Sequence, residues 1–394
     1  MARRAKKMEP TKKVAKKAAR VFPKPVSDDG QIALMKRIVK NMKHTVGTVN
    51  DMLPDTIYPS VLTSLNRMLG AGGLPSRRFY LIHGENSTGK SVLAIAIGES
   101  FRRYGFVVKA DDSEFGAEKE WYGALVQKMG FLFEMPEFMD DFFATTQDLF
   151  NAIAAERKVK KYAVNKGPGV CQIVDTINSL SPKSALEKVR KDGVKKAYSE
   201  SAQWNDWLVK SFVPQVFHNN SALVVVTQHR ENHNKSGPWD PDYKIPGGKA
   251  IQFGASIRFY VSGAKQVKEG DKVVGQQTFY VTAKNKSDGT SKQKGSFFTS
   301  NGRGGVPRGF DLVREAMEEA TYRKQIKSRA KTDGRPSGNL VEVGEFSEFF
   351  PGGLADIREA FSADTDLFAG FVEALNADAE RASYECAPPS RKKD

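Results

Sequence analysis

The fold is decided by eight consecutive residues, Gly84-Glu85-Asn86-Ser87-Thr88-Gly89-Lys90-Ser91. They match the pattern GxxxxGK[ST], follow a strand-length apolar run at Phe79–His83 and precede a helical pattern at Lys90–Tyr104. In this context the glycines let backbone amides approach phosphate oxygens, and the helix adds its N-terminal dipole. We expect Lys90 to reach the β- and γ-phosphates and Ser91 to ligate Mg²⁺. The stretch therefore predicts a phosphate-binding loop that holds ATP and Mg²⁺.

A second apolar run, Val170–Asp175, ends in a carboxylate, as a Walker B strand requires. Asp175 would then lie beside Ser91 and hold Mg²⁺ through a water molecule. Hydrolysis also needs a group that orients and polarises the attacking water. An acid after the run Phe106–Ala110 suits that role, and spacing alone leaves five candidates open: Asp111, Asp112, Glu114, Glu118 and Glu120.

From about residue 57 onward, strand-length apolar runs alternate with helical patterns. This alternation predicts an α/β domain with a mostly parallel sheet. The expected parallel strands are Phe79–His83, Phe106–Ala110, Val170–Asp175 and Ala222–Gln228. The expected helices are Lys90–Tyr104, Glu118–Met129, Thr146–Asn165 and Ser201–Phe217. Three further strands follow without helices and should form an antiparallel edge: Ser256–Ala264, Gln276–Lys284 and Ser296–Ser300.

The composition divides the chain into five parts. We expect a basic disordered arm at 1–28, an N-terminal helical oligomerisation segment at 29–56 and an ATPase core at 57–305. A C-terminal helical region at 306–385 follows a Gly/Pro-rich break, with helical patterns at about 310–330 and 353–382 around a linker-like stretch, Lys331–Asn339. A basic tail occupies 386–394. The arm could be a solvated tail, a DNA-binding arm or a targeting peptide, and the absence of serine before Ser27 disfavours the last.

The net charge and the mean hydropathy limit the kinds of partner that we expect for this chain. The formal charge is +15 and the pI about 9.5, which favours a polyanion because basic surfaces release counterions from phosphate backbones. The mean hydropathy is −0.47, and no apolar run approaches the roughly 18 residues of a membrane span, so we expect no membrane partner. The N-terminal residues contain no apolar stretch before a cleavage site, so we do not expect secretion. The two cysteines, Cys171 and Cys386, form no metal-ligand pattern, which fits a reducing cytoplasm.

Taken together, these motifs resemble the RecA family of DNA recombinases over about residues 60–300. Leu69–Pro75, the phosphate-binding loop and Ile173–Thr176 carry the resemblance in the first half. In the second half it rests on Gly247–Ala250, Phe253–Arg258 and Lys284–Lys286. Asp112–Gly116 is similar to phage-encoded recombinases of the UvsX type, which we take as the closest subgroup. The resemblance implies a RecA-type P-loop ATPase core with a mostly parallel sheet and antiparallel edge strands.

The resemblance also implies roles at the ATP site. Glu114 is expected to activate water, beside the catalytic Lys90. Gln228 is expected to sense the γ-phosphate and to couple it to the adjoining DNA-binding loop. We also place Tyr122 in the nucleotide site.

A further set of residues resembles a protomer boundary. Lys284 and Lys286 look like the pair that reaches the neighbouring subunit's ATP, and Phe253 looks like a residue at the same boundary. ATP would then lie between protomers of a helical filament. Gln252 stands where bacterial RecA has a lysine, so one boundary contact differs.

The family's two DNA-binding loops would fall near Leu186–Ser199 and His229–Pro246. Basic side chains with interleaved aromatic rings suit single-stranded DNA, because bases stack while phosphates are neutralised. The alternative is an ordinary polar loop whose aromatic residues pack back on the body. Lys210 could likewise be the polar face of a helix. The expected DNA-binding residues are Lys188, Arg190, Lys195, Lys196, Lys210, Arg230, Lys235, Trp239, Tyr243, Lys244, Gly247 and Gly248.

Three functions remain open. The first is an ATP-dependent recombinase of a bacterial or phage-infected cell that acts on single- and double-stranded DNA, with mediator and single-strand-binding proteins as partners. The second is a hexameric helicase, which Lys284 and Lys286 disfavour because helicases usually place an arginine finger there. The third is a DNA-coating filament that uses ATP only as a switch, which Glu114 disfavours.

Overall fold

The computed structural model describes residues 55–70, 72–115, 124–185, 187, 198–231, 243–246, 248–287, 291–302, 309–329 and 337–385. At its centre is a nine-stranded sheet with the order β13-β12-β11-β10-β3-β7-β6-β4-β5. Its parallel strands are β3 (Arg78–Gly84), β4 (Val107–Asp112), β5 (Leu132–Glu134), β6 (Val170–Asp175), β7 (Ala222–Gln228) and β10 (Ile257–Glu269). The antiparallel edge consists of β11 (Lys272–Asn285), β12 (Lys294–Ser300) and β13 (Gly309–Phe310). The predicted fold class is confirmed, but Ser256–Ala264, expected in the antiparallel edge, lies in β10, which pairs parallel with β3 and antiparallel with β11.

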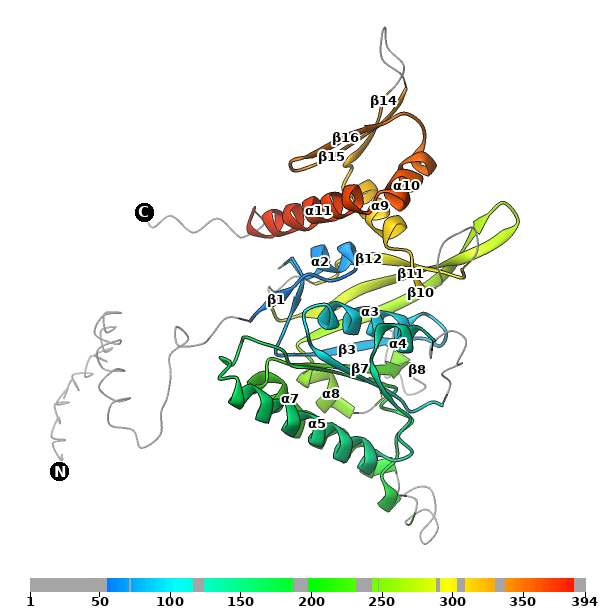
Figure 1. The fold of residues 1–394 in the computed structure, drawn as a ribbon. Coiled ribbons are helices and arrows are strands. Elements are labelled where there is room, and N and C mark those ends of the chain that lie inside the picture. The colour runs from blue at the N-terminus through cyan, green and yellow to red at the C-terminus, as the bar shows by residue number, and fades with distance from the viewer. Residues whose placement is uncertain are drawn as a thin grey trace, which may run out of the picture. The chain divides into compact units, whose positions relative to one another are not determined.

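Helices cover both faces of this sheet (Figure 1). One face carries α3 (Lys90–Arg102) and α4 (Ala124–Met129), whose apolar side chains join Tyr80 and Ile82 of β3 in one core cluster. The other face carries α5 (Met139–Val159), α7 (Tyr198–His218) and α8 (Gly248–Gly254). Strands β6 and β7 are buried almost throughout, as expected for parallel strands covered on both sides. The carboxyl ends of β3, β4, β6 and β7 therefore meet at one edge of the sheet.

Short elements complete the core. These are β1 (Ile57–Tyr58), α2 (Thr63–Met68), β2 (Leu74–Pro75), β8 (Arg230–Glu231) and β9 (Tyr243–Lys244). A turn at residues 270–271 joins β10 to β11. The expected helix Thr146–Asn165 is shifted, since α5 begins at Met139 and ends at Val159. Its early start is explained by Met139 and Phe142, which are fully buried against the sheet.

The C-terminal region corrects one prediction. Its helices are α9 (Leu312–Tyr322), α10 (Leu354–Ala363) and α11 (Thr365–Glu385). They accompany an antiparallel sheet of β14 (Ile326–Arg329), β15 (Gly338–Val343) and β16 (Phe346–Phe350), so the region is not simply helical. The helix expected to reach residue 330 ends at Tyr322, because Lys324 adopts a φ of 60° and the chain turns into β14.

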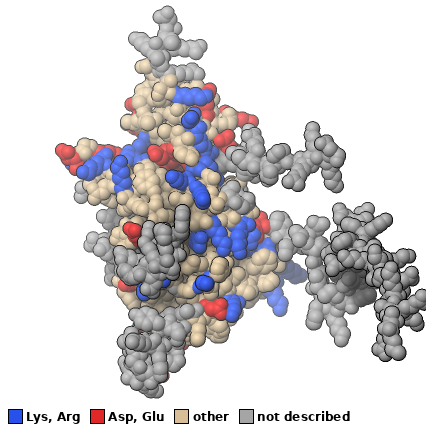
Figure 2. Space-filling view, turned by 180° about the vertical axis from the view of Figure 1, so that it is seen from behind, with Lys and Arg blue, Asp and Glu red and all other residues tan. Residues whose placement is uncertain are grey.

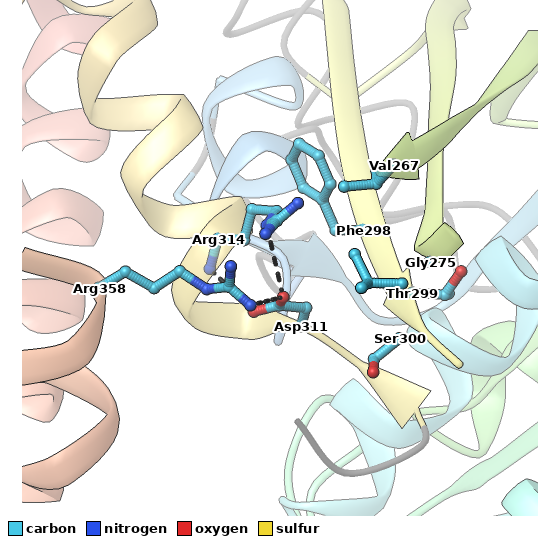
Figure 3. A pocket seen from close by; sticks show the side chains of 9 residues that line it. Val267, Gly275, Phe298, Thr299, Ser300, Asp311, Arg314 and Arg358 are labelled. Atoms are coloured by element: carbon cyan, nitrogen blue, oxygen red, sulfur yellow. Dashed lines mark hydrogen bonds and ion pairs between the residues drawn. The ribbon is translucent and has the colours of Figure 1, made fainter. Parts of the chain in front are cut away.

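Charged side chains gather where this region meets the core, and Figure 3 shows Asp311, Arg314 and Arg358 near Phe298 and Thr299 of β12. Arg314 of α9 and Arg358 of α10 each donate to Glu269 Oε1 of β10 at 2.9 Å. Arg358 also lies 3.2 Å from Asp311, whose side chain caps α9. The two arginines lower the pKa of Glu269, with the hydrogen bond from Arg358 as the largest cause. Asp311, Arg314 and Arg358 also line a small pocket together with Phe298 and Thr299 of β12.

Several predicted parts lie outside the described residues: the N-terminal arm (1–28), residues 29–54 of the helical segment expected at 29–56, the residues expected to bind DNA in the first loop, and the C-terminal tail (386–394).

Candidate nucleotide-binding site

The segment between β3 and α3 has the backbone geometry that the sequence predicts. Gly89 precedes α3 with a φ of 95°, and a Cβ there would lie 2.7 Å from Thr278 Oγ1. A Cβ on Gly84 would lie 2.4 Å from the carbonyl oxygen of Val261. Both positions therefore need glycine. Glu85, Asn86 and Ser87 between them are exposed, so their backbone is open to a phosphate chain.

Three residues could hold the nucleotide and its cation. Lys90 begins α3 and is buried, and its Nζ donates to the carbonyl oxygen of Glu85 at 2.5 Å. Burial lowers the pKa of Lys90, against the attraction of Asp175 and Glu114. Asp175 ends β6, and the Ser91 hydroxyl donates to its carboxylate.

The electrostatics of Asp175 fit a divalent cation. Its pKa is raised to about 7, mainly by burial and also by the nearby Glu114 and Asp112 carboxylates, although the Ser91 hydrogen bond and Lys90 act in the opposite direction. A bound Mg²⁺ would neutralise this concentration of negative charge. No cluster of three or more His, Cys, Asp or Glu arranged for a metal is found among the described residues.

The structure brings Glu114 and Gln228 together. Glu114 is exposed just beyond β4, and its Oε1 accepts hydrogen bonds from Gln228 Nε2 and, at 3.2 Å, from Thr176 Oγ1. Of the other acids that spacing left open, Asp111 is buried and bonded to Lys109 Nζ at 2.5 Å. Among the candidates that the structure describes, Glu114 is thus the exposed one beside Asp175. Glu118, Glu120 and Tyr122 lie outside the described residues.

The predicted boundary residues lie away from this edge. Lys284 pairs in register with Arg258 and through it with Leu81, three residues before Gly84, or about 10 Å along the strand. Its Nζ donates to the carbonyl oxygens of Gln252 and Phe253, both at 3.2 Å. Burial lowers the pKa of Lys284 to about 8, helped by Lys286 and Arg258.

Lys286 lies still farther from the loop. Its backbone amide donates to the carbonyl oxygen of Ser256, which precedes β10. The Phe253 side chain on α8 is 69 % exposed. The boundary set therefore gathers at the opposite end of the sheet from the chain's own phosphate-binding loop.

The predicted DNA-binding residues are only partly described. Arg230 and Lys244 are exposed and pair across the β8–β9 hairpin. The Tyr243 ring stacks on His229, as the alternative interpretation of a packed aromatic residue expects. Lys210 forms an ion pair with Asp206 at 2.6 Å on α7. Gly248 begins α8 with a φ of 80°.

The other predicted DNA-binding residues lie outside the described residues: Lys188, Arg190, Lys195, Lys196, Lys235, Trp239 and Gly247. Figure 2 shows Lys and Arg gathered over the middle of one face of the molecule, with fewer acidic side chains among them.

Among the described helices, none has both the length and the apolar character needed to cross a bilayer.

Sequence analysis missed two residues at the ATP edge. His83 is buried at the end of β3, and Tyr260 lies opposite it on β10. Their rings stack with 5.6 Å between centroids. One feature of the sequence indicates His83: it is the polar last residue of the otherwise apolar run Phe79–His83. In a strand it lies two residues after Leu81, so both side chains point to the same face of the sheet.

The sequence is similar to those of known proteins. Residues 35–297 match the family model described as the RecA N-terminal domain. The plasmid Protein RecA of Lactococcus lactis subsp. lactis is 26 % identical over 230 residues, which are 58 % of this chain and 61 % of that protein. Protein RecA of Staphylococcus aureus (strain JH9) is 27 % identical over 271 residues, 66 % of this chain and 72 % of that protein. The chain thus spans less than two thirds of the Lactococcus relative.

Proposed function

Because the chain belongs to the RecA family, we propose that it is an ATP-dependent homologous recombinase. It assembles into a helical filament on single-stranded DNA and exchanges strands with a homologous duplex. The observation that carries the proposal is the division of the site residues between two ends of one sheet. The nucleotide-binding residues stand at the carboxyl ends of the parallel strands, and the lysine pair stands at the other end.

Within one protomer, the residues of the ATP edge have separate tasks. Lys90 binds phosphate, and Ser91 with Asp175 holds Mg²⁺, which supplies charge neutralisation when bound. Glu114 orients a water molecule and takes its proton. The hydrogen bond from Gln228 to Glu114 Oε1 holds the carboxylate in one orientation, so a movement of Gln228 would change how Glu114 faces the water molecule. Activation of water is thereby linked to the position of Gln228.

Between protomers, Lys284 and Lys286 complete the site of a neighbour. Their distance from the loop of their own chain supports this, as does the exposed Phe253 beside them. Such a head-to-tail contact joins two different surfaces and generates a helix when the rotation does not close. Hydrolysis would then depend on assembly.

DNA lies against the second loop, whose hairpin begins two residues after Gln228. Exposed Arg230 and Lys244 and the net charge of +15 support a phosphate-backbone contact. Within the family we place the chain with phage-encoded recombinases of the UvsX type, because of residues 112–116. Mediator and single-strand-binding proteins are its expected partners, in the cytoplasm of a bacterial or phage-infected cell.

Turnover of ATP with and without single-stranded DNA, followed together with electron microscopy, tests this proposal. DNA-stimulated turnover with long helical filaments is the expected result. Closed rings with turnover would favour the hexameric helicase instead. Filaments without turnover would favour the ATP-switched DNA coat.

A further inference from the structure

The C-terminal region contains a groove between α11 and the turn that joins β15 to β16 (Figure 1). Its volume is about 430 Å³. Small residues form its α11 side, because Gly370, Ala374 and Ala377 follow helical spacing and share one face of the helix. The Phe346 ring lies on the strand side and packs on Phe371, with 5.5 Å between centroids. The groove therefore has an apolar floor that long side chains can approach closely.

The rim of this groove is acidic. Glu345, Glu373 and Asp378 line it, and no Lys or Arg is among the described residues that do so. Asp378 is oriented by Gln325 Nε2 at 2.7 Å and by Arg323 Nη1 at 3.4 Å. Glu345 and Glu373 are exposed, and neither forms an ion pair with another described residue. An apolar floor beneath free carboxylates suits a lysine or arginine side chain, whose stem is apolar and whose end is charged.

The sequence around the groove carries the same negative charge, and the sequence after it carries the opposite one. Residues 338–385 contain eleven Asp and Glu but two Lys and Arg, in a chain whose net charge is +15. The C-terminal tail (386–394) directly follows α11 and contains three consecutive basic residues, Arg391-Lys392-Lys393. Pro388-Pro389 precedes them and disfavours further helix, so the sequence predicts that the chain turns away from α11 there.

The tail is long enough to return to the groove. Along α11, Asp378 lies seven residues before Glu385, or about 10 Å, and Glu373 lies twelve residues before it, or about 18 Å. An extended chain spans about 20 Å from Glu385 to Arg391 and about 27 Å from Glu385 to Lys393. The basic residues can therefore reach every carboxylate of the α11 side.

We propose that Arg391-Lys392-Lys393 folds back along α11 and docks in this groove of its own chain. The stems of these side chains lie on the apolar floor, while their charged ends meet Glu345, Glu373 and Asp378. The short tether gives the tail an effective concentration in the millimolar range, far above that of a second copy in dilute solution. Ion pairs at an exposed rim are individually weak, so the docking is reversible and sensitive to salt. The inference goes beyond the proposed function, because the docking needs neither ATP nor DNA.

The distance between two nitroxide labels tests this docking in the full chain. One label is attached at the rim through Ser347→Cys, at an exposed position of β16, and the other in the tail through Asp394→Cys. Cys386→Ser removes the natural thiol of the tail, and Cys171 is fully buried, so labels attach only at the two chosen positions. Pulsed electron paramagnetic resonance is recorded in about 50 mM and about 1 M salt.

A narrow distribution of short separations is expected in low salt, and it should be lost in high salt because the charges are screened. Glu345→Gln combined with Glu373→Gln should reduce the share of short separations by about three- to tenfold. Glu318→Gln combined with Glu359→Gln, at exposed acids of α9 and α10, changes the net charge equally and should have no effect. Short separations that survive high salt or the first pair overturn the proposal, and so does their absence from the labelled chain in low salt.

An exchange of charges separates docking from a general change in the fold. Lys392→Glu combined with Lys393→Glu should abolish the short separations, and adding Glu345→Lys with Glu373→Lys should restore them. Absence of restoration would contradict a contact between these charges.

Dilution decides which chain supplies the tail. An about tenfold excess of unlabelled protein should leave the short separations unchanged, because both labels are on one chain. Their loss on dilution would mean that the groove binds the tail of a second copy, and docking within one chain would then be wrong.

Discussion

The two ends of the central sheet differ in how far one chain completes them. At the carboxyl ends of the parallel strands, Asp175 is bonded to Ser91, and Glu114 to Gln228. At the other end, Lys284 donates to backbone carbonyl oxygens of its own chain, and Phe253 is mostly exposed. The first end is a site whose members already contact one another. The second is a surface whose charged and apolar groups suit contact with a second protomer. Substitutions at the first end should therefore impair the site of their own chain, whereas substitutions at the second end should impair the site of a neighbour.

The largest effect is expected from Lys90→Ala at the first end. Loss of the buried amine removes the charge that binds the β- and γ-phosphates, so turnover should fall by about 10³-fold or more. The defect should persist at any protein concentration, because the residue acts within its own chain. Steady-state hydrolysis measures it, with Lys158→Ala on the exposed face of α5 as the control. Near-normal turnover would contradict the assignment of this loop.

Glu114→Gln should slow turnover by about 10²- to 10⁴-fold, because the amide cannot accept the proton of water. ATP binding should remain, so that filaments stay assembled in their ATP-bound state. Single-turnover hydrolysis and filament length by electron microscopy measure the two properties separately. Glu156→Gln, an exposed glutamate of α5, is the control. Unchanged hydrolysis in Glu114→Gln would mean that another acid activates water, either Glu118 or Glu120.

The two ends also differ in how readily the sequence predicts them. Lys90 and Asp175 were predictable because eight adjacent residues and one strand ending carry their chemistry. Glu114 needed the family resemblance, since spacing left five acids open and only the fold shows that Asp111 is buried. The contact between His83 and Tyr260 depends on the register of β3 against β10, which one sequence does not specify.

The C-terminal sheet was missed for a different reason. Val341-Glu342-Val343-Gly344-Glu345-Phe346 has the alternation and the turn glycine of a hairpin, and Gly344 adopts a φ of 56° between β15 and β16. The strands of this hairpin are short and lie beside strong helical patterns, so the region as a whole was predicted to be helical. Alternation over a few residues is weak evidence when helices flank it.

Lys284→Ala tests the second end, with an expected loss of turnover of about tenfold to a hundredfold. Nucleotide binding by dilute protomers should be unaffected, because the amine lies away from its own loop. When the Lys284→Ala and Lys90→Ala proteins are mixed in equal amounts, about a quarter of normal turnover should return. One boundary in four then combines an intact Lys90 with an intact Lys284 of the neighbouring protomer. Lys272→Ala, an exposed lysine on the same strand, is the control. Absence of restoration would place Lys284 in its own chain's site, and the contrast between the two ends would be wrong.

The smallest expected effect concerns stability at the first end. Burial lowers the pKa of His83 from 6.5 to about 3, so the unfolded chain binds more protons than the native one between these values. Stability should therefore fall as the pH drops below 6.5, by on the order of 2 kcal/mol at pH 5. His83→Phe keeps a ring of similar size and should remove that loss, whereas His218→Phe, at an exposed position on α7, should not. Urea unfolding at pH 7 and pH 5 gives the comparison. An equal acid sensitivity in His83→Phe and the unsubstituted protein would mean that His83 is protonated in the folded state, and the burial of His83 as a neutral ring would then be wrong.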